Sequence, residues 1–263
     1  MKIGFIGCGN MGGALAEAAS KKKELNIMLS NHNPEKAAAL AEKTAGKPSS
    51  NTDIALSCKY IFLGVKPKMM KSVIEEILPV LQKRRDRYIL VSMAASLKAD
   101  EVSKLAGGAS VIRIMPNTPC AVGKGLILYY ASDSVSEDET KEFCSIMQFA
   151  GICDALNEDL IDAASAVSGC GPAFAYMFIE ALADGGVLCG LPRNKALIYA
   201  AQTVLGAGEA VLLSGKHPGQ LKDEVCSPGG TTIEGVMALE KGAFRAAAAE
   251  AVIRAYNKTI EKK

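Results

Sequence analysis

Residues 2–17 read KIGFIGCGNMGGALAE, and this stretch decides the fold of the first part of the chain. It joins an apolar, strand-like run to a helical stretch through the pattern Gly7-x-Gly9-x-x-Gly12. In such a turn the first glycine permits the tight bend, the second lets the backbone approach a pyrophosphate, and the third lets the helix lie close to the strand. A plain strand–helix turn would also use these glycines, but the strand–helix series that follows favours a dinucleotide-binding site.

Short apolar runs alternate with helix-period stretches throughout residues 1–157. The predicted strands are residues 2–7, 26–30, 60–65, 87–93, 110–115, 126–131 and 152–156, and the predicted helices include 11–22, 34–45, 68–82 and 137–149. Regular alternation predicts a parallel sheet with helices on both of its faces. We therefore predict an α/β, Rossmann-like dinucleotide-binding domain over residues 1–157.

The pattern changes in residues 158–263, where strand-like runs stop and helix formers dominate. About five helices are predicted, and several are apolar on nearly every side, as in AFAYMFIEALADGGVL at 173–188. A helix that is apolar all round must be buried, and a small helical domain has little interior in which to bury several of them. We expect an all-α C-terminal domain that dimerises, so that the protein is a homodimer or an assembly of dimers.

The end of the second predicted strand bears on the choice of cofactor. An NAD site usually has an acid there to hold the ribose hydroxyls. This chain has Ser30-Asn31-His32-Asn33 instead, and Lys36 follows shortly after. These residues predict NADPH, with NADH also possible, although His32 is equally compatible with a solvated turn.

Composition excludes several classes of partner. The 263 residues are 49% hydrophobic and 22% charged, with a net charge of +2, so neither nucleic acid nor an acidic membrane is an expected partner. We see no secretory leader and no apolar run long enough to span a bilayer, because residues 171–191 contain Glu180 and Asp184. Eight irregularly spaced cysteines without a CxxC pair predict reduced thiols in a cytoplasmic protein, and no metal site.

A second glycine-rich stretch, SPGGTTIEGVMALEKGAF at 227–244, precedes another predicted helix. Thr231 with Glu234 fits a capping box. A capping box does not need Gly229 and Gly230, whereas paired glycines let backbone N–H groups turn inward and hold an anion at a helix N-terminus. Both interpretations stay open from these residues alone.

Taken together, the motifs resemble those of the pyrroline-5-carboxylate reductase family over nearly the whole length. They are FIGCGNMGGA (5–14), VKP (65–67), MPNTP (115–119), SGCGPAF (168–174), ALADGGV (181–187), GLPR (190–193) and HPGQLKDEVCSPGGTTIEGVMALE (217–240). The last of them is long, specific and outside the cofactor domain. The resemblance implies reduction of the C=N bond of 1-pyrroline-5-carboxylate to proline by NAD(P)H.

The resemblance also implies roles for individual residues. The cofactor-binding residues it implies are Gly7, Cys8, Gly9, Asn10, Met11, Gly12, Ser30, Asn31, Asn51, Val65, Lys66, Pro67, Ala94, Ala95 and Asn117. The substrate-binding residues it implies are Ser227, Gly229, Gly230, Thr231, Thr232, Ser168 and Glu158, with the Thr232 hydroxyl approaching the ring nitrogen as the catalytic group. A rigid turn at Asn117, helix packing at Ser168 and a helix-start acid at Glu158 remain alternatives. Many bacterial relatives have Arg at the position of His32, which weakens the NADP assignment.

Two rival functions also share parts of this pattern. A β-hydroxyacid dehydrogenase of the 6-phosphogluconate type has a similar opening and a helical second domain. It should carry a lysine on the helix after its glycine-rich stretch, and residues 173–182 contain none. A non-catalytic NAD(P)-binding redox sensor is the other alternative, and it needs no second anion site at SPGGTT.

Overall fold

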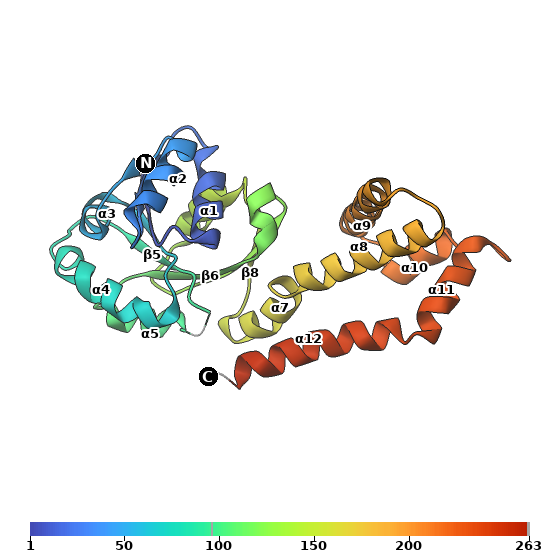
Figure 1. Cartoon of the computed structure of the whole chain (residues 1–263). Helices are drawn as coiled ribbons and strands as arrows, with labels where there is room; N and C mark the ends of the chain where they lie inside the picture. The colour runs from blue at the N-terminus through green and yellow to red at the C-terminus, as the bar shows by residue number, and fades with distance from the viewer. Residues whose placement is uncertain (96, 262–263) are drawn as a thin grey trace. The chain divides into compact units, whose positions relative to one another are not determined.

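The computed structural model describes residues 1–95 and 97–261, and the chain divides into two compact units. Unit 1 comprises Met1–Gly169 together with the end of the chain from Thr259, and unit 2 comprises Cys170–Lys258. Figure 1 shows strands in the first and helices alone in the second. The expected domain boundary after residue 157 stays a prediction.

Unit 1 contains a single eight-stranded sheet with strand order β3-β2-β1-β4-β5-β6-β7-β8. Its strands are β1 (Lys2–Ile6), β2 (Asn26–Ser30), β3 (Lys47–Pro48), β4 (Tyr60–Leu63), β5 (Ile89–Ser92), β6 (Val111–Pro116), β7 (Gly125–Ala131) and β8 (Gly151–Ala155). The helices are α1 (Asn10–Ser20), α2 (Pro34–Thr44), α3 (Asn51–Ser57), α4 (Pro67–Leu81), α5 (Ala99–Leu105), α6 (Glu137–Met147) and α7 (Ile161–Ser168), with short 3-10 helices η1 (Thr118–Val122) and η2 (Glu158–Leu160). The α/β fold predicted for this region is confirmed.

The prediction of a parallel sheet is wrong at one strand pair, so that β7 and β8 run opposite to the other six strands. β7 runs antiparallel to β6, with Ile114 opposite Tyr129, while the other strand pairs are parallel. Only the short η1 segment joins these two strands, and a parallel connection needs a crossover of a dozen or more residues. The short strand β3 and helices α3 and α5 also lie outside the predicted elements, because each is too brief to show a clear period.

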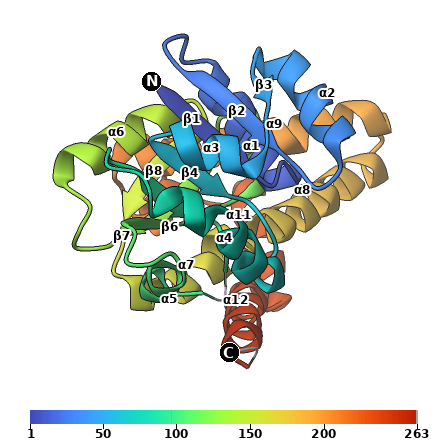
Figure 2. The ribbon, with the colours of Figure 1, turned by 90° about the vertical axis from the view of Figure 1, so that its left-hand side faces the viewer.

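Buried side chains cover both faces of this sheet. One cluster joins strand residues such as Phe5 and Phe62 to α1, α2 and α6, and the other joins Ile61 and Leu90 to α3, α4 and α5. The rings of Phe5 and Phe62 stack with their centroids 4.4 Å apart. Figure 2 gives a second view of these layers. Every residue of β4 is buried, as expected for a strand covered by helices on both sides.

Unit 2 is entirely helical: α8 (Gly171–Leu188), α9 (Arg193–Ser214), α10 (Pro218–Glu224), α11 (Thr231–Lys241) and α12 (Phe244–Ile260), whose last residues belong to unit 1. The structure describes every residue of this unit, and only Ala183, Ala196 and Ala200 are buried in it. The predicted helical C-terminal region is confirmed, and most of its large apolar side chains are exposed or half-buried.

The expectation that no apolar run is long enough to span a membrane is wrong by length and composition. Residues Glu158–Leu188 and Arg193–Ser214 both meet that criterion, and 17% and 11% of their most apolar windows are buried. The core helix of a soluble protein meets the same criterion, which considers length and composition only. These two stretches therefore form an apolar surface that is largely exposed in the single chain. Their composition does not identify the partner that covers it.

Candidate active site

The turn after β1 has the geometry of a pyrophosphate cradle. Gly7 has a φ of +96°, and a Cβ there would lie 2.7 Å from the carbonyl carbon of Gly64. A Cβ on Gly12 would lie 2.3 Å from the Gly7 oxygen, so this glycine lets α1 approach the strand. Gly9 faces open space, and it precedes a helix with no side-chain cap and no acid in its first turn. The N–H groups at this positive helix end are available to a phosphate.

A cavity of about 640 Å³ opens beside this turn, between the ends of β1, β2 and β4. The order β2-β1-β4 makes this the point where the order of the strands reverses, which is where open α/β sheets bind ligands. Of the predicted cofactor residues, the cavity is lined by Gly7, Gly9, Ser30, Asn31, Asn51, Val65 and Lys66. The structure therefore brings together residues from four separate segments, and the open cradle beside them fits a dinucleotide.

A hydrogen-bonded chain organises the end of β2. The Ser30 hydroxyl donates to Asn51 Oδ1 at 2.6 Å, and Asn51 Nδ2 donates to Glu76 Oε2 at 2.8 Å. Sequence reasoning missed Glu76, which lies on α4 and lines the same cavity. No sequence signal marked it, because the acid of an NAD site is sought at the end of β2 and this one comes from another helix.

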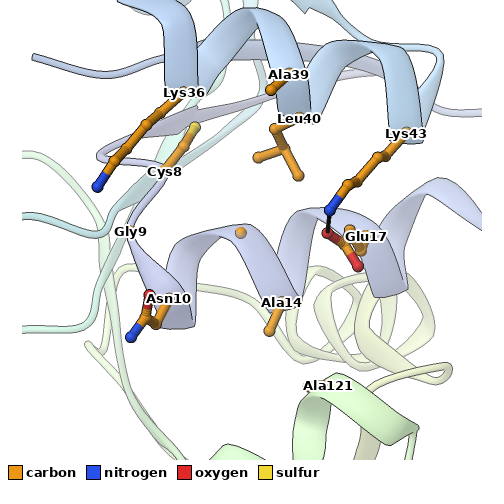
Figure 3. Close-up of a pocket in the computed structure, with 11 residues that line it drawn as sticks. Cys8, Gly9, Asn10, Ala14, Glu17, Lys36, Ala39, Leu40, Lys43 and Ala121 are labelled. Carbon is orange, nitrogen blue, oxygen red and sulfur yellow. Dashed lines mark ion pairs between the residues drawn. The ribbon is translucent and has the colours of Figure 1, made fainter. Parts of the chain in front are cut away.

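A second cavity, of about 430 Å³, lies between α1 and α2 and shares Gly9 with the first. Figure 3 shows Lys36 and Lys43 extending from α2, with Lys43 Nζ 3.9 Å from Glu17 Oε1. The predicted residues Cys8 and Asn10 line this cavity. Burial raises the pKa of the Cys8 thiol to about 11, and its Sγ lies 3.3 Å from the Ser30 carbonyl oxygen. Cys8 is therefore an unreactive thiol that connects the glycine turn to β2.

The other predicted cofactor residues line neither of these cavities: Met11, Gly12, Pro67, Ala94, Ala95 and Asn117. Pro67 begins α4, and the Ala94–Ala95 segment follows β5. Asn117 uses its side chain within the protein, because Nδ2 donates to the Ser168 carbonyl at 3.0 Å and Oδ1 accepts from Leu126 N at 2.9 Å. The rigid-turn alternative for Asn117 thus has structural support, and its predicted place beside the nicotinamide stays a prediction.

Glu158 and Ser168, predicted on the substrate side, lie at the end of unit 1. Glu158 Oε1 accepts from the Ala99 N–H at 2.6 Å and lies 3.3 Å from Nη1 of Arg113, a buried residue that sequence reasoning also missed. The Ser168 hydroxyl is buried and has no hydrogen-bond partner among the residues that the structure describes. Glu158 is therefore engaged within the protein, whereas Ser168 keeps a free hydroxyl.

The SPGGTT stretch begins α11 in unit 2. The helix starts at Thr231, its N-cap is Gly230, and no side chain caps it, so the predicted Thr231–Glu234 capping box does not form. The reason is register: Thr231 is already the first helical residue and cannot cap the helix from outside it. Gly229 has a φ of +66°, and the Gly230 N–H bonds the Ser227 carbonyl at 3.0 Å. Thr231 and Thr232 are exposed beside uncapped helical N–H groups, an arrangement able to hold a carboxylate.

Comparisons with known proteins agree with this geometry. Residues 158–262 match the family described as pyrroline-5-carboxylate reductase dimerisation, and residues 2–96 match NADP oxidoreductase, coenzyme F420-dependent. The pyrroline-5-carboxylate reductase of Pisum sativum is 41% identical over 98% of this chain and 95% of its own length. The enzyme of that name from Escherichia coli (strain K12) is 40% identical over 99% of this chain and 96% of its own.

Solved structures give the same result. Plasmodium falciparum pyrroline carboxylate reductase with NADP bound matches with a TM-score of 0.83 and 34% identity, covering 98% of this chain and 97% of that one. The pyrroline-5-carboxylate reductase from Coxiella burnetii matches with a TM-score of 0.90 and 31% identity over the same shares. Because these likenesses extend through both units at more than 30% identity, the chain belongs to the pyrroline-5-carboxylate reductase family.

Proposed function

We propose that this protein reduces the C=N bond of 1-pyrroline-5-carboxylate to give proline, with NADPH as the hydride donor. The observation that carries the proposal is the presence of two separate anion-ready glycine turns. One opens on the dinucleotide cavity at Gly9, and the other precedes α11 at Gly229–Gly230. A protein that only sensed NADPH would use the first and would have no need of the second.

The protein's own residues orient the substrate. A ring imine is substantially protonated near neutral pH, and the iminium carbon already accepts a hydride, so that positioning contributes more than proton transfer. The uncapped N–H groups at the start of α11, with the Ser227 and Thr231 side chains, hold the carboxylate, and the Thr232 hydroxyl approaches the ring nitrogen. NADPH, when bound, supplies the hydride that goes to the ring carbon, and the C=N π electrons pass to the protonated nitrogen.

Neither histidine is placed as a general base. His32 lines the dinucleotide cavity, and His217 caps α10, where its Nδ1 accepts from the Gly219 N–H at 3.0 Å. A reaction that begins from an iminium needs no such base, whereas oxidation of a hydroxy acid does. The arrangement therefore favours imine reduction over the β-hydroxyacid dehydrogenase alternative.

NADPH is the preferred cofactor in this proposal, with NADH also used. The end of β2 has no acid, and Lys36 follows on α2. Glu76 approaches the same place but is bonded to Asn51. Ser30→Asp should shift the preference toward NADH, because the new carboxylate repels a 2′-phosphate and accepts hydrogen bonds from ribose hydroxyls. A variant with the wild-type ratio of NADPH to NADH rates would remove this part of the proposal.

The proposal also includes the oligomeric state and the cellular location of the protein. Unit 2 forms a homodimer, or an assembly of dimers, because many large apolar side chains of its helices are exposed in the single chain. A cytoplasmic location is supported by the eight cysteines, which are all free thiols. We propose no nucleic acid, membrane or metal as a partner.

The direct test measures NADPH oxidation by the purified chain with pyrroline-5-carboxylate, and in parallel with 2- and 3-keto acids. We expect turnover of the cyclic imine alone. Equal turnover of a keto acid would favour the dehydrogenase alternative. NADPH binding without any turnover would favour the sensor.

A further inference from the structure

Arg113 is a fully buried arginine in the middle of β6, and it is not one of the proposed cofactor-binding or substrate-binding residues. Its side chain is 1% exposed. Nη2 donates to the Ala95 carbonyl at 2.8 Å and lies 3.5 Å from Asp162 Oδ1, while Nη1 lies 3.3 Å from Glu158 Oε1. One guanidinium therefore connects the loop after β5 with η2 and α7.

The same cluster fixes both ends of the segment between β5 and α5. Arg113 holds the carbonyl of Ala95, and Glu158 accepts the N–H of Ala99, the first residue of α5. Glu158 in turn contacts Arg113. The Ala95 carbonyl and the Ala99 N–H are thereby bonded to side chains from β6 and η2.

Stability alone is a weak reason for burying such a cluster. Removing an arginine and two carboxylates from water costs several kcal/mol per ion, and well-packed apolar residues of similar volume are often as stable or more so. The Arg113 Nε also has no partner among the residues that the structure describes, which adds a further cost. What apolar residues cannot supply is a planar set of donors that holds a carbonyl and two carboxylates at fixed positions.

Ala94 and Ala95 follow β5, and the strand order indicates which half of a dinucleotide would reach them. In an open α/β sheet the strand after the glycine turn holds the adenosine ribose, which here is β2. The order β2-β1-β4-β5 puts β5 on the opposite side of the glycine turn. A dinucleotide that crosses the turn therefore directs its nicotinamide half toward the end of β5, where Ala94 and Ala95 follow.

We propose that Arg113 is a positioning residue that presents the Ala94–Ala95 backbone to the nicotinamide half of the bound cofactor. It touches neither the cofactor nor the substrate, and acts by fixing the Ala95 carbonyl against η2 and α7. Glu158 belongs to the same positioning cluster. The inference rests on the proposed function to the extent that it needs a nicotinamide dinucleotide as the ligand.

The test compares two ligands that differ in the nicotinamide half. NADPH and 2′-phospho-ADP-ribose share the adenosine, the 2′-phosphate and the pyrophosphate, and only NADPH carries the nicotinamide. Arg113→Lys keeps the positive charge but not the set of donors. By calorimetry on the full chain we expect its Kd for NADPH to rise about tenfold, with the Kd for 2′-phospho-ADP-ribose within twofold of wild type.

Arg87→Met is the matched control. Arg87 precedes β5, whereas Ala94 and Ala95 follow the opposite end of that strand. Arg87 pairs with Glu139 at 2.6 Å and bonds Ser110 at 2.8 Å, and none of the three residues lines either of the two cavities. It should lower the melting temperature and leave both Kd values unchanged. Asp162→Asn keeps Arg113 and weakens one of its ion pairs, so the Kd for NADPH should rise by less than tenfold while the Kd for 2′-phospho-ADP-ribose stays unchanged. If Arg113→Lys does not fold, the Asp162 variant tests the role of Arg113.

The proposal is overturned if both ligands weaken alike in the Arg113 and Asp162 variants, since that outcome indicates a general role in folding. It is also overturned if neither Kd changes. A wild-type chain that binds NADPH but does not reduce the imine would remove the proposed function, while the difference between the two ligands would still decide the role of Arg113.

Discussion

The two units of this chain bury their apolar residues in opposite ways. In unit 1 the buried side chains form two continuous clusters, one on each face of the sheet. In unit 2 three alanines are the whole of the buried set, while leucines and isoleucines along α8 and α9 are exposed. Unit 1 therefore completes its own core, whereas unit 2 leaves most of its large apolar side chains exposed or half-buried.

The difference shows that a fold needs an inner layer to enclose its apolar residues. A sheet covered on both faces encloses its apolar residues within one chain, whereas a few helices that are apolar all round have no inner layer to enclose. The match of residues 158–262 to a dimerisation family supports the proposal that a second copy is the cover. Four experiments test this difference between the two units, and they follow in descending order of expected effect.

Ile198→Glu should have the largest effect. Ile198, Leu205 and Leu212 are spaced seven residues apart and form one exposed apolar stripe on α9. A carboxylate buried against a second copy costs several kcal/mol, so we expect the dimer to dissociate and the activity to fall more than a hundredfold. Analytical ultracentrifugation at micromolar concentration measures the assembly.

Leu56→Glu is its matched control. Leu56 in unit 1 is 61% exposed and Ile198 is 60% exposed, so the two substitutions differ only in the unit that receives the charge. We expect Leu56→Glu to sediment and react as wild type does. Identical sedimentation of all three proteins would refute the contrast between the units.

Phe62→Ala should destabilise unit 1 by about 3–5 kcal/mol, because Phe62 is fully buried and stacks on Phe5. The loss should be the same at low and high protein concentration. Leu205→Ala in unit 2 should instead lower a stability that rises with concentration, as expected when a second copy provides the burial. Urea unfolding at two concentrations of each variant separates the two behaviours.

Thr232→Ala tests whether unit 2 contributes chemistry as well as contacts. Loss of a hydrogen bond to the ring nitrogen is worth roughly 1.5–3 kcal/mol, so kcat/KM should fall about ten- to hundredfold with NADPH affinity unchanged. Gly235→Ala, on the same helix with open space around it, should keep full activity. Unchanged turnover in Thr232→Ala would leave SPGGTT with only a structural role.

The smallest effect concerns pH. The Arg87 guanidinium, which bonds the Glu139 carboxylate, lowers the pKa of Glu139 to about 2 from an ordinary 4.5. A depressed pKa stabilises the fold above pH 4.5, and this stabilisation is lost as the pH falls through about 2. The difference in melting temperature between wild type and Arg87→Met should therefore shrink from pH 6 to pH 2.5. A constant difference would show that the pair contributes by packing alone.

Much of this protein was predictable from local sequence pattern. Strand and helix periods predicted seven of the strands because the apolar spacing depends only on which face of each element is buried. The glycine turn was predictable because only glycine tolerates the φ of Gly7 and the close approach at Gly12. The excess of apolar surface on the helices of unit 2 was likewise predictable, because a small helical domain has little interior in which to bury several apolar helices.

Other features were decided only by the tertiary structure. β7 is antiparallel because the connection before it is too short for a crossover, and Glu76 approaches Asn51 because two helices meet. Arg113 lies within the predicted strand 110–115, and nothing local identified Ala95, Glu158 and Asp162 as its partners. Periodicity and glycine sterics are local properties, whereas the partner of a buried charge depends on which distant segments the fold brings within hydrogen-bonding distance.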